Sequence, residues 1–245
     1  MNKLNMTYSD AIEQVMLNNG YIAPLKLLYK EIWNYKDRSS IKGKTPQMTI
    51  QERVQRDERF TRIGLGVYAL TDKIHLLKKQ EFPKTETERI KTRHGEIQGM
   101  LLEIGNARKD VKETYTNDKK FIFQNKTLGS LATIQSVPMF TYEKIVKKSA
   151  TFADVIWFNG EEDRLFPSHI FEVENSTDFR DAFLKFLEMQ YFLTEFVCVS
   201  PLDRKTKFEN EIDRVAFRPI RDRIRFLSYE NIENDYNVSL SKTYI

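Results

Sequence analysis

The chain has 245 residues, of which 40% are hydrophobic and 30% charged, with a net charge of +4. This length allows two domains of ordinary size, and no run of roughly 18 apolar residues is present that would form a membrane helix. The single cysteine, Cys198, cannot build a disulfide framework or a structural zinc site, so we expect a reducing, cytoplasmic setting.

The first part of the chain carries the pattern of three short helices. A first helix is expected to reach Asn19, because Gly20 follows it and suits a helix end. A second helix is expected to begin at Pro24, since proline is favoured in a first helical turn. A third begins near residues 45–46, or at Thr49, which can form a capping box.

A change of hydrophobic period follows these helices. Residues 59–63 and 67–70 alternate as strands around a glycine-containing turn, which predicts a β-hairpin. Three helices followed by a hairpin is the order of a winged helix, which we assign to residues 1–75. The charged stretch 76–87 is expected to be a linker, and residues 88–245 a second domain.

The second domain is expected to alternate between helices and strands. Its predicted strands are 121–123, 152–158, 169–174, 196–199 and 224–229, and its predicted helices are 87–105, 141–148, 181–193 and 205–217. This order predicts an α/β (α+β) core with a mixed central sheet flanked by helices.

Three acidic residues lie in the apolar segments of this second domain. Asp154 stands within the predicted strand 152–158, where an unpaired carboxylate is costly. Glu172 and Glu174 lie two residues apart on the next predicted strand, and therefore on one face of it. If the two strands are neighbours, the three carboxylates converge. A hard divalent cation such as Mg²⁺ would neutralise them and could activate water for phosphodiester hydrolysis.

The order of these acids resembles the signature of PD-(D/E)XK nucleases, an aspartate followed on the next strand by (D/E)-x-K. Here Glu174 stands where the lysine is usual, as in the E-x-E variant of some restriction enzymes, and Ala153 stands where the proline is usual. The resemblance covers roughly residues 88–230. It implies a metal-dependent DNA endonuclease.

The resemblance also implies roles for individual residues. Asp154, Glu172 and Glu174 would bind Mg²⁺, which Mn²⁺ can replace. Either Glu174 or Lys185, on the following helix, would take the role of the missing lysine. Glu96 on the first core helix would be an accessory acid, with Glu103 of the same helix as the second choice. The histidines at 94 and 169 are expected to be structural or surface residues.

The first domain resembles the HARE-HTH domain, a winged helix-turn-helix of restriction endonucleases and chromatin proteins. The match covers about residues 5–72 and depends on Gly-Lys-Thr-Pro at 43–46 and on Phe-x-Arg-Ile-Gly-x-Gly-x-Tyr-Ala-Leu at 60–70. A polar helix face for the major groove and a helix N-terminus for phosphate agree with DNA binding. The residues expected to contact DNA are Lys44, Thr45, Gln47, Thr49, Gln51, Arg53, Gln55, Arg59 and Arg62.

Both halves of the chain together predict a type II restriction endonuclease that cuts duplex DNA and is encoded near a cognate DNA methyltransferase. Cutting both strands of a symmetric site suggests a homodimer. Two alternatives stay open. One is a nuclease that requires modified, methylated DNA. The other is a non-catalytic DNA-binding regulator with a degenerate nuclease fold, which the missing lysine favours.

Overall fold

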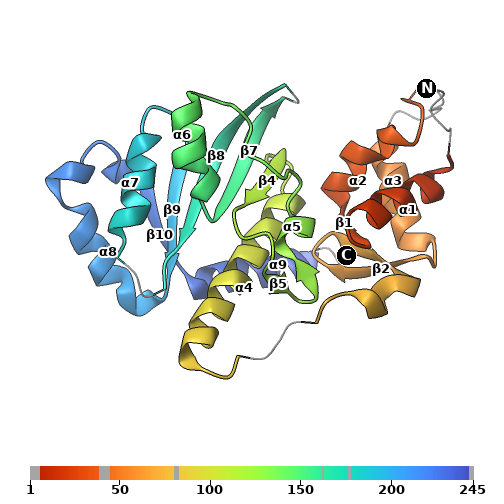
Figure 1. Ribbon diagram of the computed structural model, residues 1–245, viewed down its shortest axis with the longest axis horizontal. Coiled ribbons are helices and arrows are strands. Elements are labelled where there is room, and N and C mark those ends of the chain that lie inside the picture. Colours follow the sequence, from red (N-terminus) through yellow and green to blue (C-terminus); the bar gives the residue numbers. More distant parts are fainter. Residues whose placement is uncertain (1–5, 39–44, 80–82, 162, 176–177, 243–245) are drawn as a thin grey trace.

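The computed structural model describes residues 6–38, 45–79, 83–161, 163–175 and 178–242. Figure 1 shows a small N-terminal unit beside a larger sheet, with helices α4 (Glu86–Ala107) and α9 (Tyr229–Lys242) between them. None of the described helices combines the length and the apolar character needed to cross a membrane.

The N-terminal unit consists of helices packed on a small antiparallel sheet of order β1-β3-β2. Its elements are α1 (Tyr8–Asn18), β1 (Ile22–Pro24), α2 (Leu25–Glu31), η1 (Ile32–Asn34), α3 (Pro46–Arg56), β2 (Phe60–Gly64), β3 (Val67–Leu70) and η3 (Thr71–Leu76). Thr7 caps α1, because its hydroxyl accepts a hydrogen bond from the Asp10 amide at 3.2 Å. The helices and the hairpin expected from the sequence are therefore present.

The larger unit is a mixed five-stranded sheet of order β10-β9-β8-β7-β4. Its strands are β4 (Glu113–Thr116), β7 (Val155–Glu161), β8 (Arg164–Val173), β9 (Glu195–Ser200) and β10 (Ile224–Ser228), beside the short pair β5 (Ile122–Phe123) and β6 (Lys126–Thr127). Its other elements are α5 (Leu128–Leu131), α6 (Glu143–Lys148), η4 (Ala150–Phe152), α7 (Arg180–Glu188), η5 (Leu202–Arg204), α8 (Lys205–Ile212), η6 (Val215–Phe217) and η7 (Arg221–Arg223). The α/β core with a mixed sheet flanked by helices is confirmed.

The two faces of this sheet pack against different helices. β4, β7 and β8 pair antiparallel, whereas β8, β9 and β10 pair parallel. Phe171 and Val173 face the core formed with α4 and α9. Ile170, which alternates with them, faces the core formed with α7 and α8. Glu172 shares this second face, so an acid lies among apolar neighbours.

Some predicted boundaries were wrong. The strand that carries the first acid begins at Val155 instead of residue 152, because residues 150–152 form the turn η4, closed by a hydrogen bond from the Ala153 amide to the Ala150 carbonyl at 3.1 Å. Asp154 therefore directly precedes β7. The helices predicted at 181–193 and 205–217 end early, and α9 was not predicted.

The two units share a hydrophobic core. Leu65, Val67 and Ala69 of the N-terminal sheet belong to the same buried cluster as Ile97 and Leu101 of α4. Because this contact is apolar and continuous, the N-terminal unit is packed directly on the larger one.

Candidate active site

Asp154 is held between two strands at the end of the sheet. Its Oδ2 accepts a hydrogen bond from the Val173 amide at 2.8 Å, which ties the carboxylate to β8. On the β4 side, Asn117 Nδ2 lies 3.4 Å from Oδ1, and the Thr116 hydroxyl donates to the Asp154 carbonyl at 2.8 Å. The position of this carboxylate is thus fixed from both neighbouring strands.

Glu172 of β8 lies beside Asp154, which directly precedes β7. The antiparallel register pairs Val155 with Phe171, so the next residue pair is Asp154 and Glu172. The Glu172 side chain is only 2% exposed, and Lys185 Nζ of α7 forms an ion pair with its Oε2. Its Oε1 is buried and has no hydrogen-bond partner among the described residues. One oxygen is thus matched by a cation of the chain, and the other is not.

Burial and repulsion act together on this acid. Burial, followed by the nearby Asp154 carboxylate, raises the pKa of Glu172 well above its usual value, and Glu174 adds to the rise. Burial lowers the pKa of Lys185, but the adjacent Glu172 carboxylate outweighs this effect, so the net shift is upward. Lys185 and Glu172 thus form an ion pair next to Asp154.

Glu174 follows the last residue of β8. The Glu174 amide donates to the Val199 carbonyl at 2.8 Å, and the Glu174 carbonyl accepts from the Ser200 hydroxyl at 2.6 Å. The backbone at Glu174 therefore continues along β9. The side chain is mostly buried and contributes electrostatically at Glu172 and Lys185. The structure thus places Asp154 next to Glu172 and Lys185 against Glu172. Glu174 lies near enough for its charge to act on both Glu172 and Lys185.

Helix α4 contributes a histidine that the sequence interpretation had treated as structural. His94 Nε2 lies 3.4 Å from Asp154 Oδ1 and 3.0 Å from Gln98 Nε2. Burial lowers the pKa of His94, but the hydrogen bond and charge of Asp154 outweigh it and raise the pKa overall. The available signal was the i, i+4 spacing of His94 and the buried Gln98, which places both on one side of the helix.

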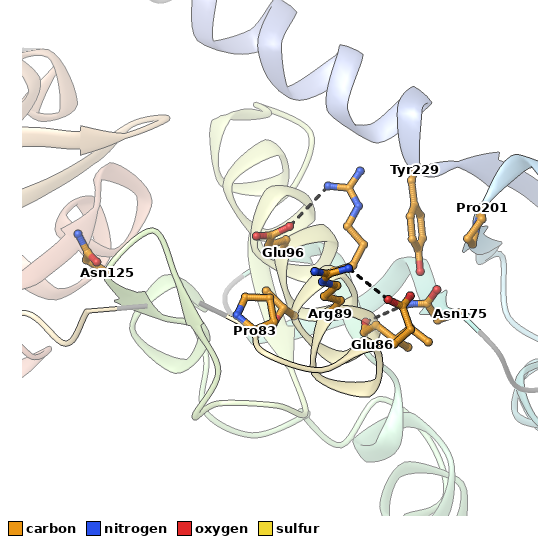
Figure 2. Close-up of a pocket in the computed structure, with 11 residues that line it drawn as sticks. Pro83, Glu86, Arg89, Glu96, Asn125, Asn175, Pro201 and Tyr229 are labelled. Carbon is orange, nitrogen blue, oxygen red and sulfur yellow. Dashed lines mark hydrogen bonds and ion pairs between the residues drawn. The ribbon is translucent and has the colours of Figure 1, made fainter. Parts of the chain in front are cut away.

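Glu96 is not part of this group. Its Oε2 lies 3.5 Å from Arg93 Nη1, and Arg93 also pairs with Glu233 of α9 at 2.6 Å. Glu96 lines a pocket of about 690 Å³ beside α4 (Figure 2), together with Asn175 and Tyr229. Two positions along a helix correspond to about 200°, so a helix that turns His94 toward Asp154 turns Glu96 away.

The acidic group offers few ligands for a metal ion. In the described part of the chain, no group of three or more His, Cys, Asp or Glu side chains is arranged to bind one. Asp154 and Glu172 still offer carboxylate oxygens, and Glu172 Oε1 is a buried acceptor without a donor. These oxygens suit a hard cation such as Mg²⁺, which keeps several waters and needs few protein ligands. The three-carboxylate ligand set stays a prediction.

Comparison with protein families assigns residues 76–243 to the Type II restriction enzyme NmeDI C-terminal domain. The match covers more than half of the chain and contains the whole acidic site. The chain belongs to this family. Neither the curated proteins nor the solved structures include a match.

Membership of the NmeDI C-terminal domain family supports a restriction endonuclease. The matched segment includes Asp154, Glu172 and Lys185. The N-terminal unit precedes the match almost entirely.

Helix α3 of this family member presents most of the residues expected to contact DNA. Ile50 and Val54 are buried in the N-terminal core, so the opposite side of α3 faces outward. The exposed ones are Thr45, Gln47, Gln51, Arg53 and Gln55, whereas Thr49 is half-buried. Lys44 lies outside the described residues.

The two arginines of the hairpin are engaged within the protein. Arg59 forms ion pairs with Asp10 at 3.0 Å, Glu13 at 2.8 Å and Asp57 at 2.9 Å. Arg62 Nε donates to the Gly64 carbonyl at 3.0 Å and its side chain is partly buried. Both arginines thus have partners within the protein, and because the Arg59 side chain is still 41% exposed, contacts of Arg59 and Arg62 with the DNA backbone stay a prediction.

Proposed function

We propose that this chain is a type II restriction endonuclease that hydrolyses phosphodiester bonds of duplex DNA with Mg²⁺. The observation that carries the proposal is the group of Asp154, Glu172 and Lys185, in which one buried carboxylate oxygen lacks a donor. Buried acids placed side by side are unfavourable for folding, so a functional requirement explains them better than stability does.

Each residue of this group has a proposed role of the PD-(D/E)XK type. Asp154 and Glu172 would hold the cation, with Glu174 as a further ligand or water-orienting group. Mg²⁺, or Mn²⁺ in its place, would polarise the scissile phosphate and acidify a bound water. Lys185 would offset the charge that develops on the phosphate, in place of the lysine missing from the strand.

The N-terminal unit is proposed to be a HARE-HTH-like winged helix that binds DNA. The exposed polar face of α3 supports this role, since glutamines and an arginine can reach base edges in a major groove. The DNA contacts expected from the sequence all remain in the proposal, and for Arg59 and Arg62 they would require an exchange of their present partners for phosphate. Two-strand cleavage would be achieved by a homodimer, and a cognate methyltransferase would protect the host DNA.

Nuclease assays on the full chain test this function. Purified protein is incubated with plasmid and phage DNA with Mg²⁺, Mn²⁺ or EDTA, and the cut ends are mapped. We expect discrete fragments with either metal and none with EDTA. Asp154→Asn and Glu172→Gln should lower the rate by at least ~100-fold while DNA binding is retained.

Glu209→Gln on α8 serves as the control, because Glu209 is an exposed acid on a different helix. The control should cut like the wild type. DNA binding without any nicking, and identical in wild type and Asp154→Asn, would instead indicate a regulator with a degenerate nuclease fold. Cutting restricted to methylated DNA would indicate a modification-dependent nuclease.

A further inference from the structure

A fully buried ion pair lies where the N-terminal hairpin meets the larger unit. Glu103 of α4 and Lys126 of β6 are 0% exposed, and Lys126 Nζ lies 2.7 Å from Glu103 Oε1. Isolated buried charges are costly, and an apolar pair would fill the same space more favourably. The pair therefore calls for an explanation other than stability.

Both charged side chains form hydrogen bonds with the backbone of the turn between β2 and β3. Glu103 Oε2 accepts a hydrogen bond from the Leu65 amide at 2.7 Å, and Lys126 Nζ donates to the Ile63 carbonyl at 3.1 Å. Tyr236 of α9 donates to the same Glu103 oxygen at 2.8 Å. One acid and one base thus bind the amide and the carbonyl of the same turn.

The fit around this turn leaves no spare room. A Cβ atom on Gly64 would lie 2.6 Å from Glu103 Oε1 and 2.8 Å from Lys126 Nζ. Leu65 is buried in the core that it shares with α4. The turn that a winged helix would offer to DNA is therefore occupied by the protein itself.

We propose that Glu103 and Lys126 are positioning residues. They lock the β2–β3 turn to the nuclease unit and so fix the distance along DNA between the sequence bound by α3 and the bond cut beside Asp154. This inference rests on the proposed function, since it assumes that the N-terminal unit reads DNA. It also means that the chain between the two units does not set that distance.

Linker insertion tests the proposal. A short Gly-Ser segment is inserted after Lys79 in the full chain, and the cut ends of genomic DNA are mapped. With the turn locked, the cut position relative to the recognised sequence stays unchanged. A cut position that moves with the insertion would overturn the proposal, because the linker would then set the distance.

Variants that remove the contacts of Glu103 and Lys126 with the β2–β3 turn provide a second experiment. Gly64→Ala, and the double variant Glu103→Leu with Lys126→Met, are expected to spread the cuts of the inserted chain over several positions. The Leu65 amide should exchange its hydrogen at least ~10-fold faster in the double variant, which equals ~1.4 kcal/mol of lost protection. The exposed pair Lys205 and Glu209, replaced in the same way, is the control.

The outcomes separate the two hypotheses. If the double variant of the inserted chain folds and still cuts at a single position, the ion pair does not position the units. If the wild-type chain cuts no DNA at all, the proposed function fails. Hydrogen exchange at residues 63–65 then still decides whether the pair holds the turn, because it requires no cleavage.

Discussion

The Glu172 carboxylate is buried next to a second acid, Asp154. It forms an ion pair with Lys185, thirteen residues further along the chain. In the PD-(D/E)XK motif that we propose for this chain, the usual lysine would stand at the position of Glu174. Lys185 of α7 reaches Glu172 because α7 packs on the face of the sheet toward which Glu172 points, and in the proposed site it would substitute for that lysine. The positive charge is thus supplied by a different element of the fold.

Replacement of Lys185 tests this substitution. We expect Lys185→Met to reduce DNA cleavage by ~100-fold or more with little change in DNA binding, because a charge at the phosphate is removed. Lys185→Arg, which keeps the charge, should retain more activity. Lys207→Met, at an exposed lysine of α8, should cleave normally. Equal cleavage by Lys185→Met and wild type would remove Lys185 from the site.

The reactivity of Cys198 can test how tightly the sheet face next to Glu172 is packed. It pairs in register with Glu172 and is completely buried, and burial followed by the charge of Glu172 raises the pKa of its thiol. A thiol that is buried and protonated is a poor nucleophile. We expect no modification by a water-soluble thiol reagent in the folded protein and one thiol per chain after denaturation. Rapid labelling of the native protein would show that this face of the sheet is open.

At the scale of elements, α4 is the helix on which both units and the site depend. It begins with a capping box between Thr85 and Glu88, and it carries glycines where other elements come close. A Cβ atom on Gly105 would lie 2.4 Å from Trp157 Nε1, and Trp157 Nε1 donates to the Leu101 carbonyl at 3.1 Å. The helix can therefore lie directly on β7.

Gly105→Ala should destabilise the protein. Although alanine favours a helix, the methyl group would collide with a buried ring, which typically costs about 1–3 kcal/mol. The melting temperature should fall by roughly 2–4 °C for each kcal/mol lost. Lys91→Ala, at an exposed position of the same helix, should melt like the wild type. An unchanged melting temperature for Gly105→Ala would contradict the close approach.

At the scale of the whole molecule, lysines of α2 join the N-terminal unit to the larger one. Lys26 Nζ donates to the carbonyls of Gly105, Arg108 and Val111 at the end of α4. Lys30 pairs with Glu113 of β4 at 2.9 Å. The carbonyls at a helix C-terminus attract a cation, which explains why a lysine is tolerated in this interface.

The pH dependence of stability should reveal Lys26. Burial lowers the pKa of Lys26 to about 8, while the unfolded chain keeps the usual value of 10.5. Between these values the unfolded state binds more protons, so stability attributable to Lys26 rises with pH. The melting temperature of the wild type minus that of Lys26→Met should increase by roughly 4–8 °C from about pH 7 to about pH 9.5. A difference that stays constant or falls would show that the Lys26 amine is not buried as described.

The sequence alone determined the local elements and the acids. Periodicity, capping residues and glycines mark α1, α3, α4 and the β2–β3 hairpin, because these signals depend on neighbours in the chain. The apolar runs at β8 and β9 predicted buried strands, and the alternation of Glu172 and Glu174 placed both acids on one face. These features are decided within a few residues, so they can be read without the fold.

Only the tertiary structure determined which side chains from different elements contact one another. That Lys185 reaches Glu172 and that His94 instead of Glu96 faces Asp154 depend on which helices cover which sheet face. That Arg59 pairs with Asp10 and Glu13 depends on how α1 packs in the N-terminal unit. The grip of Glu103 and Lys126 on the hairpin turn joins segments far apart in the chain. Contacts of this kind follow from packing across elements, and the spacing of residues along one strand or helix does not contain them.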